Sequence, residues 1–352
     1  MNQQRAVVTG GGGFLGSRIV SMLLDAGYSV TSFSRGQYPA LRARGVSCRV
    51  GDLADASAVR QACDGADVVF HIAAKAGLWG RYADYYRANV EGTRNVVEAC
   101  RRNGVSKLVY TSTPSVVLSG RDLRNAREDV PFPKRYCAHY ARTKAEAERV
   151  VLAANGADLA TVALRPHIIW GPGDTQLLPR LVARHAAKRL MIVGKGDNLV
   201  DTTFVDNAAR AHLAAAERLH PGSAVAGRVY FISQGDPRPI KRMMNDLLRA
   251  AGQPAVEQSI PVPVARGAAW LIEAFYRLFD VAAEPPLTRF LVMQFSSDHY
   301  FDISAARRDL GYEPSISIEA GLETCRMSMA LEREAAAATH AGGATTTAVL
   351  GA

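Results

Sequence analysis

The sequence has few cysteines and no long hydrophobic run. Only five of its 352 residues are cysteine, and these lie far apart with no CxxC spacing. Their odd number and wide spacing exclude a disulfide-stabilised scaffold and a cysteine-based zinc site. We therefore expect reduced cysteines that serve packing, and no metal. No stretch offers the ~20 uninterrupted apolar residues that a membrane span requires.

The sequence also lacks a basic cluster and a signal segment. Its net charge is +9, but the lysines and arginines are scattered rather than gathered beside stacking aromatics. We therefore expect no nucleic-acid partner. The opening "MNQQRAVVTG" has no apolar signal core, which favours a cytoplasmic location.

Segment 262–280 is the most hydrophobic helix candidate, and it is interrupted by Arg266, Glu273 and Arg277. The pattern predicts an amphipathic helix that covers a core. A lid over an apolar substrate, a contact with a partner protein and a peripheral membrane contact are the alternatives.

Short apolar runs alternate with helical patterns through the first half of the chain. This order is typical of βαβ units and predicts an α/β fold with a doubly wound parallel sheet. Runs that are nearly all apolar suit strands buried on both faces. The predicted strands cover 6–10, 28–34, 46–53, 66–74, 107–113 and 159–166, and the predicted helices 14–26, 55–64, 83–103 and 139–155.

Turn-forming glycines and prolines become frequent after residue 172. We predict a sheet domain over 1–172, rejoined by about 203–235, in which 227–235 reads as a strand. A smaller substrate-binding region is expected over 173–202 and 236–332. The low-complexity segment 333–352 predicts a disordered tail.

A glycine-rich turn follows the first strand. "VVTGGGGFLGSRIV" places Gly10, Gly13 and Gly16 in a GxxGxxG pattern between a strand and a helix. Glycines allow a tight turn and the close approach of a pyrophosphate to free N–H groups at the helix start, where we expect Phe14 and Leu15. The pattern predicts a dinucleotide site.

The end of the second strand carries Ser34 and Arg35 instead of the carboxylate that would bind a ribose 2′-hydroxyl. A hydroxyl and a cation suit a 2′-phosphate, so we expect NADPH/NADP+; the alternative is that Arg35 is a solvated loop residue. Asp52 in "GDL", with Leu53, is expected beside the adenine.

Tyr140 and Lys144 share one helix face in "HYARTKAEAE", and hydroxyls end the strand "YTSTPSVV". A phenol acts as a proton donor or acceptor near neutrality only if its anion is favoured, and a neighbouring ammonium can do this. We predict catalytic roles for Tyr140, Lys144 and Thr113. Ser115 is the alternative hydroxyl.

These motifs, with "HIAA" and "LRPHIIWGPGD", follow one another as in the extended short-chain dehydrogenases/reductases, which the chain resembles over about 5–330. The resemblance implies a Rossmann-type cofactor domain and a smaller C-terminal substrate domain. It also implies that the cofactor is contacted by Ala73, Ala74, Lys75, Pro166 and Ile168.

Within that superfamily the chain resembles the 3β-hydroxysteroid dehydrogenase branch through "LTRFLVMQFSSDHYFDISAARRDLGYEP". "AAKAGLWG" and "GDNLVDTTFVDNAARAH" resemble the bacterial 2-alkyl-3-oxoalkanoate reductases of long-chain olefin biosynthesis. The resemblance implies reduction of a hydrophobic β-keto acid, a homodimer and an assembly with enzymes of the same pathway. The alternatives are a 3β-hydroxysteroid or sterol-4α-carboxylate 3-dehydrogenase, a sugar-nucleotide epimerase or dehydratase, and a non-catalytic NADP(H)-binding sensor.

A buried substrate carboxylate needs a cation or backbone donors. Lys75, His167 and Arg87 are the candidates, although His167 also fits a purely structural role. Trp79 and Trp170 are expected at an apolar pocket, with a core position as the alternative for Trp170. The aromatics of 262–280, Trp270, Phe275, Tyr276 and Phe279, are expected in core packing, with the covering of alkyl chains as the alternative.

Overall fold

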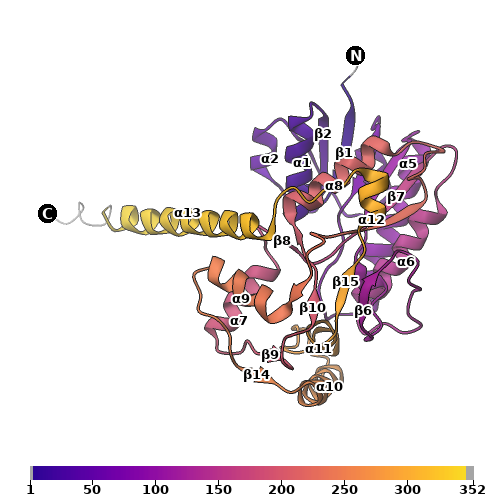
Figure 1. The fold of residues 1–352 in the computed structure, drawn as a ribbon. Coiled ribbons are helices and arrows are strands. Elements are labelled where there is room, and N and C mark those ends of the chain that lie inside the picture. The colour runs from indigo at the N-terminus through magenta and orange to yellow at the C-terminus, as the bar shows by residue number, and fades with distance from the viewer. Residues whose placement is uncertain (1–2, 346–352) are drawn as a thin grey trace.

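A computed structural model describes residues 3–345 and has a seven-stranded parallel sheet at its centre (Figure 1). All six strands predicted for the first half are present. The strand order is β12-β7-β5-β4-β1-β2-β3, so the chain winds outward in both directions from β1. The strands are β1 Arg5–Thr9, β2 Ser29–Ser34, β3 Ser47–Val50, β4 Val68–His71, β5 Lys107–Thr111, β7 Ala160–Pro166 and β12 Arg228–Ile232.

Helices cover both faces of this sheet. The central strands are therefore buried throughout, as all seven residues of β7 are, and their apolar β-branched composition follows from this. One face packs against α1 Phe14–Asp25, α2 Pro39–Ala43, α8 Val205–Arg218 and α12 Ser304–Leu310. The other packs against α3 Ala56–Ala62, α5 Gly92–Arg102 and α6 His139–Ala153.

Strand β12 rejoins the sheet after a long excursion of the chain, as predicted for 227–235. It pairs in parallel with β7, with Arg228 opposite Val162. The excursion forms the second region, so the chain passes between the two parts more than once.

The predicted helix over 83–103 is interrupted by a wider turn. Helix α4 (Tyr82–Tyr86) leads into a π-helical turn, η1 (Arg87–Glu91), and then into α5. Gly92 allows α5 to approach Leu53, whose Cβ would lie 2.7 Å from a side-chain carbon at position 92. Turns of this kind occur frequently at functional sites because they redirect one side chain.

The smaller region is built on short strands and four further helices. A four-stranded sheet has the order β13-β10-β15-β6, and two-stranded pairs join β11 to β8 and β14 to β9. The elements are β6 Leu123–Ala126, β8 Ile169–Trp170, α7 Leu177–Ala186, β9 Ile192–Val193, β10 Leu199–Val200, β11 Thr203–Phe204, β13 Arg238–Pro239, α9 Ile240–Ala250, β14 Ser259–Ile260, α10 Val262–Leu278, α11 Arg289–Ser296 and β15 His299–Phe301.

The predicted boundaries differ from the structure in two places. Strand β6, inside 1–172, belongs to the sheet of the smaller region. Helix α12, inside 236–332, packs through Ala306 and Leu310 against the main sheet. Both segments are short, and the chain crosses from one region to the other within one or two turns on either side of them. Composition along the chain does not reveal such short crossings.

The structure describes a helix over most of the segment for which low complexity predicts a disordered tail. Helix α13 spans Ile318–Thr345, while 346–352 lie outside the described residues. Alanine is the strongest helix former, so the run of alanines is able to continue a helix that has already started.

Within residues 3–345, no helix is both long enough and apolar enough to cross a membrane.

Candidate active site

The glycine turn after β1 brings the backbone close to the start of α1. A Cβ on Gly16 would lie 2.1 Å from the Gly10 carbonyl oxygen, and Gly10 itself has φ +72°. Gly13 is the N-cap of α1, with no side-chain cap and no acidic residue in the first turn. The exposed N–H groups and the positive end of the helix dipole therefore fit a pyrophosphate, with Phe14 and Leu15 opening the helix as predicted.

Tyr38 lies over this turn, which the sequence analysis missed. A carbon added to Gly12 would come within 2.3 Å of the Tyr38 ring. No motif marks Tyr38, because it reaches the turn from the loop after β2.

Two groups at the end of β2 are without a partner. The Ser34 hydroxyl is buried and makes no hydrogen bond. Arg35 is exposed, and no carboxylate in residues 3–345 pairs with it. A buried hydroxyl with no partner costs free energy unless a ligand meets it, so this edge fits a polar group of the cofactor.

Asp52 follows β3 and lies 3.5 Å from an Arg87 guanidinium nitrogen. Its other contact is the backbone N–H of Ala54. Arg87 therefore lies at the predicted adenine end, and the structure does not bring it to the substrate end as one alternative expected.

A buried histidine fixes the end of β4 beside the cradle. His71 Nδ1 lies 2.8 Å from the Thr9 hydroxyl oxygen, which also accepts the N–H groups of Ile72 and Ala73. His71 Nε2 lies 2.9 Å from the Thr93 hydroxyl. Burial, and then the Lys144 charge, lower the pKa of His71 to about 3, so this ring is neutral and structural.

Asn89 of the π-helical turn holds the backbone of Lys75. Its side chain accepts from the Lys75 N–H at 2.7 Å and donates to the Lys75 carbonyl at 3.1 Å. It also donates to Thr143, one position before Lys144. The sequence analysis missed Asn89, whose only signal would have been the departure from α-helical periodicity.

The Lys75 side chain lies over the ring of Tyr85. Its Nζ lies 5.4 Å from the centroid of the Tyr85 ring, and Tyr85 acts electrostatically on Tyr140. Lys75 is partly buried, and Ala74 beside it is exposed.

Tyr140, Thr113 and Ser115 form one polar group at the end of β5. The Thr113 Oγ1 lies 3.2 Å from the Ser115 Oγ, and the Thr113 side chain acts to lower the pKa of Tyr140 against the larger effect of burial. The structure therefore brings the two alternative hydroxyls together, with Thr113 acting on the tyrosine.

Burial governs the pKa values of Tyr140 and Lys144. It raises the pKa of Tyr140 to about 12, against the Thr113 hydrogen bond, and lowers that of Lys144 to about 7. Lys144 donates to the Thr111 carbonyl at 2.6 Å and lies over the Tyr110 ring. The expectation that Lys144 lowers the pKa of the phenol is thus not met, because both groups are desolvated and the ammonium donates to a carbonyl.

The chain leaves β7 through a strained residue. Ile168 has φ +36°, a conformation that β-branched residues rarely adopt, two positions after Pro166. Strained residues concentrate at functional sites, and this one lies where the cofactor contact was predicted.

His167 and Trp170 are buried rather than open to a substrate. His167 Nδ1 lies 2.5 Å from Asp201, its ring contacts Phe301, and its Nε2 has no partner. Trp170 is fully buried and donates to Thr202. These positions favour the structural alternative for both residues.

Trp79 ties the loop after β4 to the end of α10. Its indole N–H donates to the Val281 carbonyl at 3.1 Å, and its ring contacts Tyr276 and the Arg277 guanidinium. Burial lowers the pKa of His139, next to Tyr140, and Arg142 and Arg277 lower it further. Arg277 is thus a cation whose charge reaches His139, the residue before Tyr140, and no motif in the sequence marks it.

The expectation of core packing for the aromatics of 262–280 is wrong for three of them. Trp270, Phe275 and Phe279 are exposed, and only Tyr276 is partly buried. Helix α10 packs through alanines and Glu273 instead, so its large side chains lie on the outer face.

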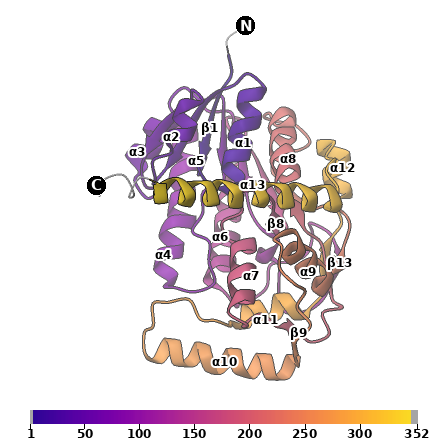
Figure 2. The same ribbon diagram turned by 90° about the vertical axis from the view of Figure 1, so that its left-hand side faces the viewer.

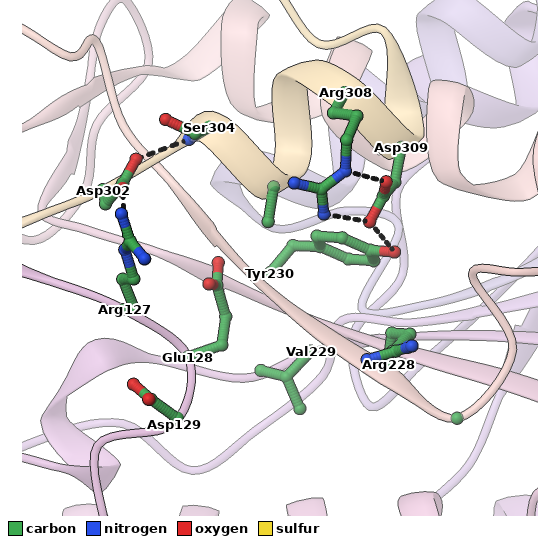
Figure 3. Close-up of a pocket in the computed structure, with 12 residues that line it drawn as sticks. Arg127, Glu128, Asp129, Arg228, Val229, Tyr230, Asp302, Ser304, Arg308 and Asp309 are labelled. Atoms are coloured by element: carbon green, nitrogen blue, oxygen red, sulfur yellow. Dashed lines mark hydrogen bonds and ion pairs between the residues drawn. The ribbon is translucent and has the colours of Figure 1, made fainter.

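A pocket of about 520 Å³ lies away from this site, between the start of β12, the loop after β6 and α12 (Figure 3). Two of its arginines are paired, Arg127 with Asp302 and Arg308 with Asp309. Glu128 accepts the backbone N–H of Phe231, so it covers part of the open edge of β12.

A dinucleotide cradle that opens onto a tyrosine and a lysine one helical turn apart defines the class of protein. It is an oxidoreductase that uses a nicotinamide cofactor.

Comparison with known proteins gives the family. Residues 7–263 match the 3-beta hydroxysteroid dehydrogenase/isomerase family, and the chain belongs to it. It is 49% identical over 93% of its length to a Stenotrophomonas maltophilia 2-alkyl-3-oxoalkanoate reductase, covering 99% of that protein. It is 45% identical over 92% of its length to one from Shewanella oneidensis, covering 86% of that protein. A solved structure of MoeE5 with UDP-glucose and NAD is similar, with a TM-score of 0.72, 25% identity and coverage of 93% and 99% of the two chains.

Proposed function

We propose that this enzyme reduces the 3-ketone of a 2-alkyl-3-oxoalkanoic acid to the 2-alkyl-3-hydroxy acid with NADPH, in long-chain olefin biosynthesis. The observation that carries the proposal is the 49% identity, over nearly the whole of both chains, to a reductase of that name. The presence of Tyr140 and Lys144 one turn apart on α6, with Thr113 acting on the pKa of Tyr140, supports catalysis over a sensor role.

Tyr140 donates the proton that the reduced ketone oxygen requires, and in the reverse direction it accepts one. Thr113, with Ser115 beside it, orients that oxygen by hydrogen bonding. The bound cofactor supplies the hydride. Lys144 holds the nicotinamide ribose; with a pKa near 7 it is also able to change its protonation state at physiological pH.

Ser34 and Arg35 select NADPH through its 2′-phosphate. The Ser34 hydroxyl lacks a partner and the Arg35 guanidinium has no carboxylate, so both are free to bind an anion. Charge-assisted hydrogen bonds of this kind contribute on the order of 1.5–3 kcal/mol each.

Lys75 and Arg277 receive the substrate carboxylate. Lys75 lies over the Tyr85 ring and Arg277 over the Trp79 ring, and the Arg277 charge lowers the pKa of His139, the residue before Tyr140. His167, held by Asp201, and Arg87, beside Asp52, are not assigned this role. Trp79, next to the Arg277 guanidinium, contacts an apolar part of the substrate.

A second candidate is oxidation of a sterol-4α-carboxylate. A mouse sterol-4-alpha-carboxylate 3-dehydrogenase is 34% identical over 91% of this chain, covering 89% of that protein. Its substrate carries a carboxylate on the carbon next to the one that bears the reacting oxygen, so Lys75 and Arg277 would also bind that carboxylate.

We further propose a cytoplasmic, homodimeric enzyme that assembles with others of its pathway. The five cysteines are free thiols, which suits a reducing compartment, although exposed Cys137 does not have the packing role expected.

The test is oxidation in the reverse direction, because β-keto acids lose CO2. Purified enzyme with NADP+ receives a 2-alkyl-3-hydroxyalkanoic acid or, separately, a 3β-hydroxysterol with a 4α-carboxylate. Absorbance of the reduced nicotinamide is expected to rise with the first. A rise with the sterol alone would contradict the proposal and favour the second candidate.

A further inference from the structure

Ile168 holds a backbone conformation that its own side chain disfavours. Within residues 3–345, four residues other than glycine have a positive φ: Asn125, Ile168, Lys188 and Asp280. Asparagine and aspartate tolerate this region, and Lys188 follows the last turn of α7, where helices commonly end in this way. Ile168 is β-branched and follows a strand, so a φ of +36° persists there only if its surroundings enforce it.

This residue lies where the two halves of the molecule meet. It connects β7 to β8, and Figure 2 shows β8 below α8 and above α7 and α9, as does Figure 1. Near the end of β7, the Leu164 carbonyl accepts the Ser112 N–H at 2.6 Å. The carbonyl of that same peptide group, which belongs to Thr111, accepts from Lys144. Ile168 therefore follows a strand that ends beside the catalytic lysine, at the sheet edge where a doubly wound fold binds its cofactor.

Backbone contacts fix the chain on either side of Ile168. The Thr203 N–H donates to the Ile168 carbonyl at 3.2 Å, and the Thr203 hydroxyl bonds the His167 carbonyl at 2.8 Å. The His167 N–H donates to the Ile232 carbonyl of β12 at 3.0 Å. These bonds tie the turn to two neighbouring strands, but none of them uses a side chain of the turn itself.

Asp201 holds the same turn through a side chain. The His167 Nδ1–H donates to Asp201 Oδ1 at 2.5 Å, since a carboxylate only accepts. The other carboxylate oxygen accepts the Phe301 N–H of β15 at 3.0 Å. Both side chains are buried, and His167 Nε2 has no partner in the described chain, so the ring has this one hydrogen bond. A single carboxylate thus joins the end of β7 to the sheet of the smaller region.

We propose that His167 and Asp201 form a positioning pair, which holds Ile168 in its strained conformation with its backbone against the nicotinamide end of the cofactor. A charge-assisted hydrogen bond shielded from water is directional enough to fix the ring, and the ring fixes the residue that follows it. Loss of the pair lets Ile168 relax and moves the main chain at the edge of the site. The proposal depends on a nicotinamide cofactor and not on the identity of the substrate.

A purely structural pair would behave differently. Its loss would lower the stability of the fold and would affect the whole of the bound cofactor alike, or none of it. Loss of a positioning pair weakens binding of the nicotinamide ring and leaves binding of the adenosine and pyrophosphate unchanged. The ligand 2′-phospho-ADP-ribose, which is NADPH without its nicotinamide ring, separates the two cases.

Calorimetric titration of the full chain with NADPH and with 2′-phospho-ADP-ribose tests the proposal. NADH and ADP-ribose are titrated in parallel, so a failure of the proposed NADPH preference is seen separately and does not affect the result. Asp201→Asn keeps the shape of the side chain and an acceptor for Phe301, and it replaces the acceptor for His167. We expect this variant to bind NADPH about fivefold more weakly, the effect of one modest hydrogen bond, and to bind 2′-phospho-ADP-ribose as the wild type does.

Variants of His167 provide a rescue. His167→Phe keeps a ring but removes the donor, so the same selective loss is expected. His167→Asn carries an amide N–H close to the position of Nδ1 and should restore most of the lost affinity. Thr161→Val is the control, because it removes a buried hydrogen bond near the start of β7. It should lower the melting temperature and leave the affinities for both ligands unchanged.

Equal losses of affinity for NADPH and 2′-phospho-ADP-ribose in Asp201→Asn would overturn the proposal, because they would indicate a general loosening of the site. Wild-type affinity for both ligands would overturn it as well and leave the pair a structural one. The same holds if His167→Asn binds NADPH as weakly as His167→Phe does.

Discussion

The two halves of the molecule offer different groups to their ligands, backbone groups in one half and side chains in the other. In the cofactor half, backbone groups form the cradle: the turn closes only because position 16 has no side chain, and Asn89 fixes the main chain of Lys75. In the substrate half, side chains on α10 and the loop after β4 provide the contacts. A backbone cradle suits one invariant ligand, whereas side chains can be exchanged to suit another substrate.

Tyr140→Phe should have the largest effect, because it removes the hydroxyl proposed to exchange a proton with the substrate while leaving the cofactor half unchanged. Turnover is expected to fall about a thousandfold, within the range general acid–base groups contribute. The dissociation constant for NADPH, from quenching of protein fluorescence, should change little. Retained turnover would remove Tyr140 from the mechanism.

Arg35→Ala tests the one side chain that the cofactor half uses for selection. We expect the ratio of kcat/KM for NADPH over NADH to fall about thirtyfold, the loss of one charge-assisted bond. Arg42→Ala, exposed on the nearby helix α2, is the control. Equal ratios for wild type and Arg35→Ala would favour the alternative that Arg35 is a solvated loop residue with no role in cofactor selection.

Lys75→Met and Arg277→Gln test whether these two residues bind the substrate carboxylate rather than the cofactor. Each should raise KM for the hydroxy acid about tenfold and leave NADPH binding unchanged. Exposed Arg189→Gln is the control for lost surface charge. Weaker NADPH binding in the Lys75 variant would instead assign that lysine to the cofactor half.

Lys144→Met is expected to have the smallest effect of these variants, a change in thermal stability whose sign follows from the pKa of Lys144. Burial lowers the pKa of Lys144 to about 7, so the folded state binds its proton less tightly than the unfolded state does. This penalty is complete below pH 7 and fades as pH rises toward the ordinary lysine value near 10.5.

The inactive Lys144→Met variant should therefore melt a few degrees higher than the wild type at pH 7, and the difference should shrink by pH 10. Exposed Lys134→Met provides the baseline in the same calorimetric series. A lower melting temperature would mean that the bond to the Thr111 carbonyl outweighs the desolvation.

Local patterns predicted the sheet, the glycine turn and the Tyr140–Lys144 pair, because strand periodicity and short spacings are properties of the chain itself. Arg277 could not be predicted, since it reaches His139 only through the packing of a distant helix. The pKa of Lys144 depends on its burial, and the position of Asn89 depends on a π-helical turn. Neither feature is visible in the spacing of residues along the sequence.

The late arrival of β12 has a consequence for synthesis. β7 is made long before β12, which pairs with one of its edges, so a growing chain carries a mostly apolar strand with that edge unpaired until residue 232 has left the ribosome. The first half is thus complete as a sequence well before it is complete as a sheet, and a chain cut short in that interval would offer the bare edge to its neighbours.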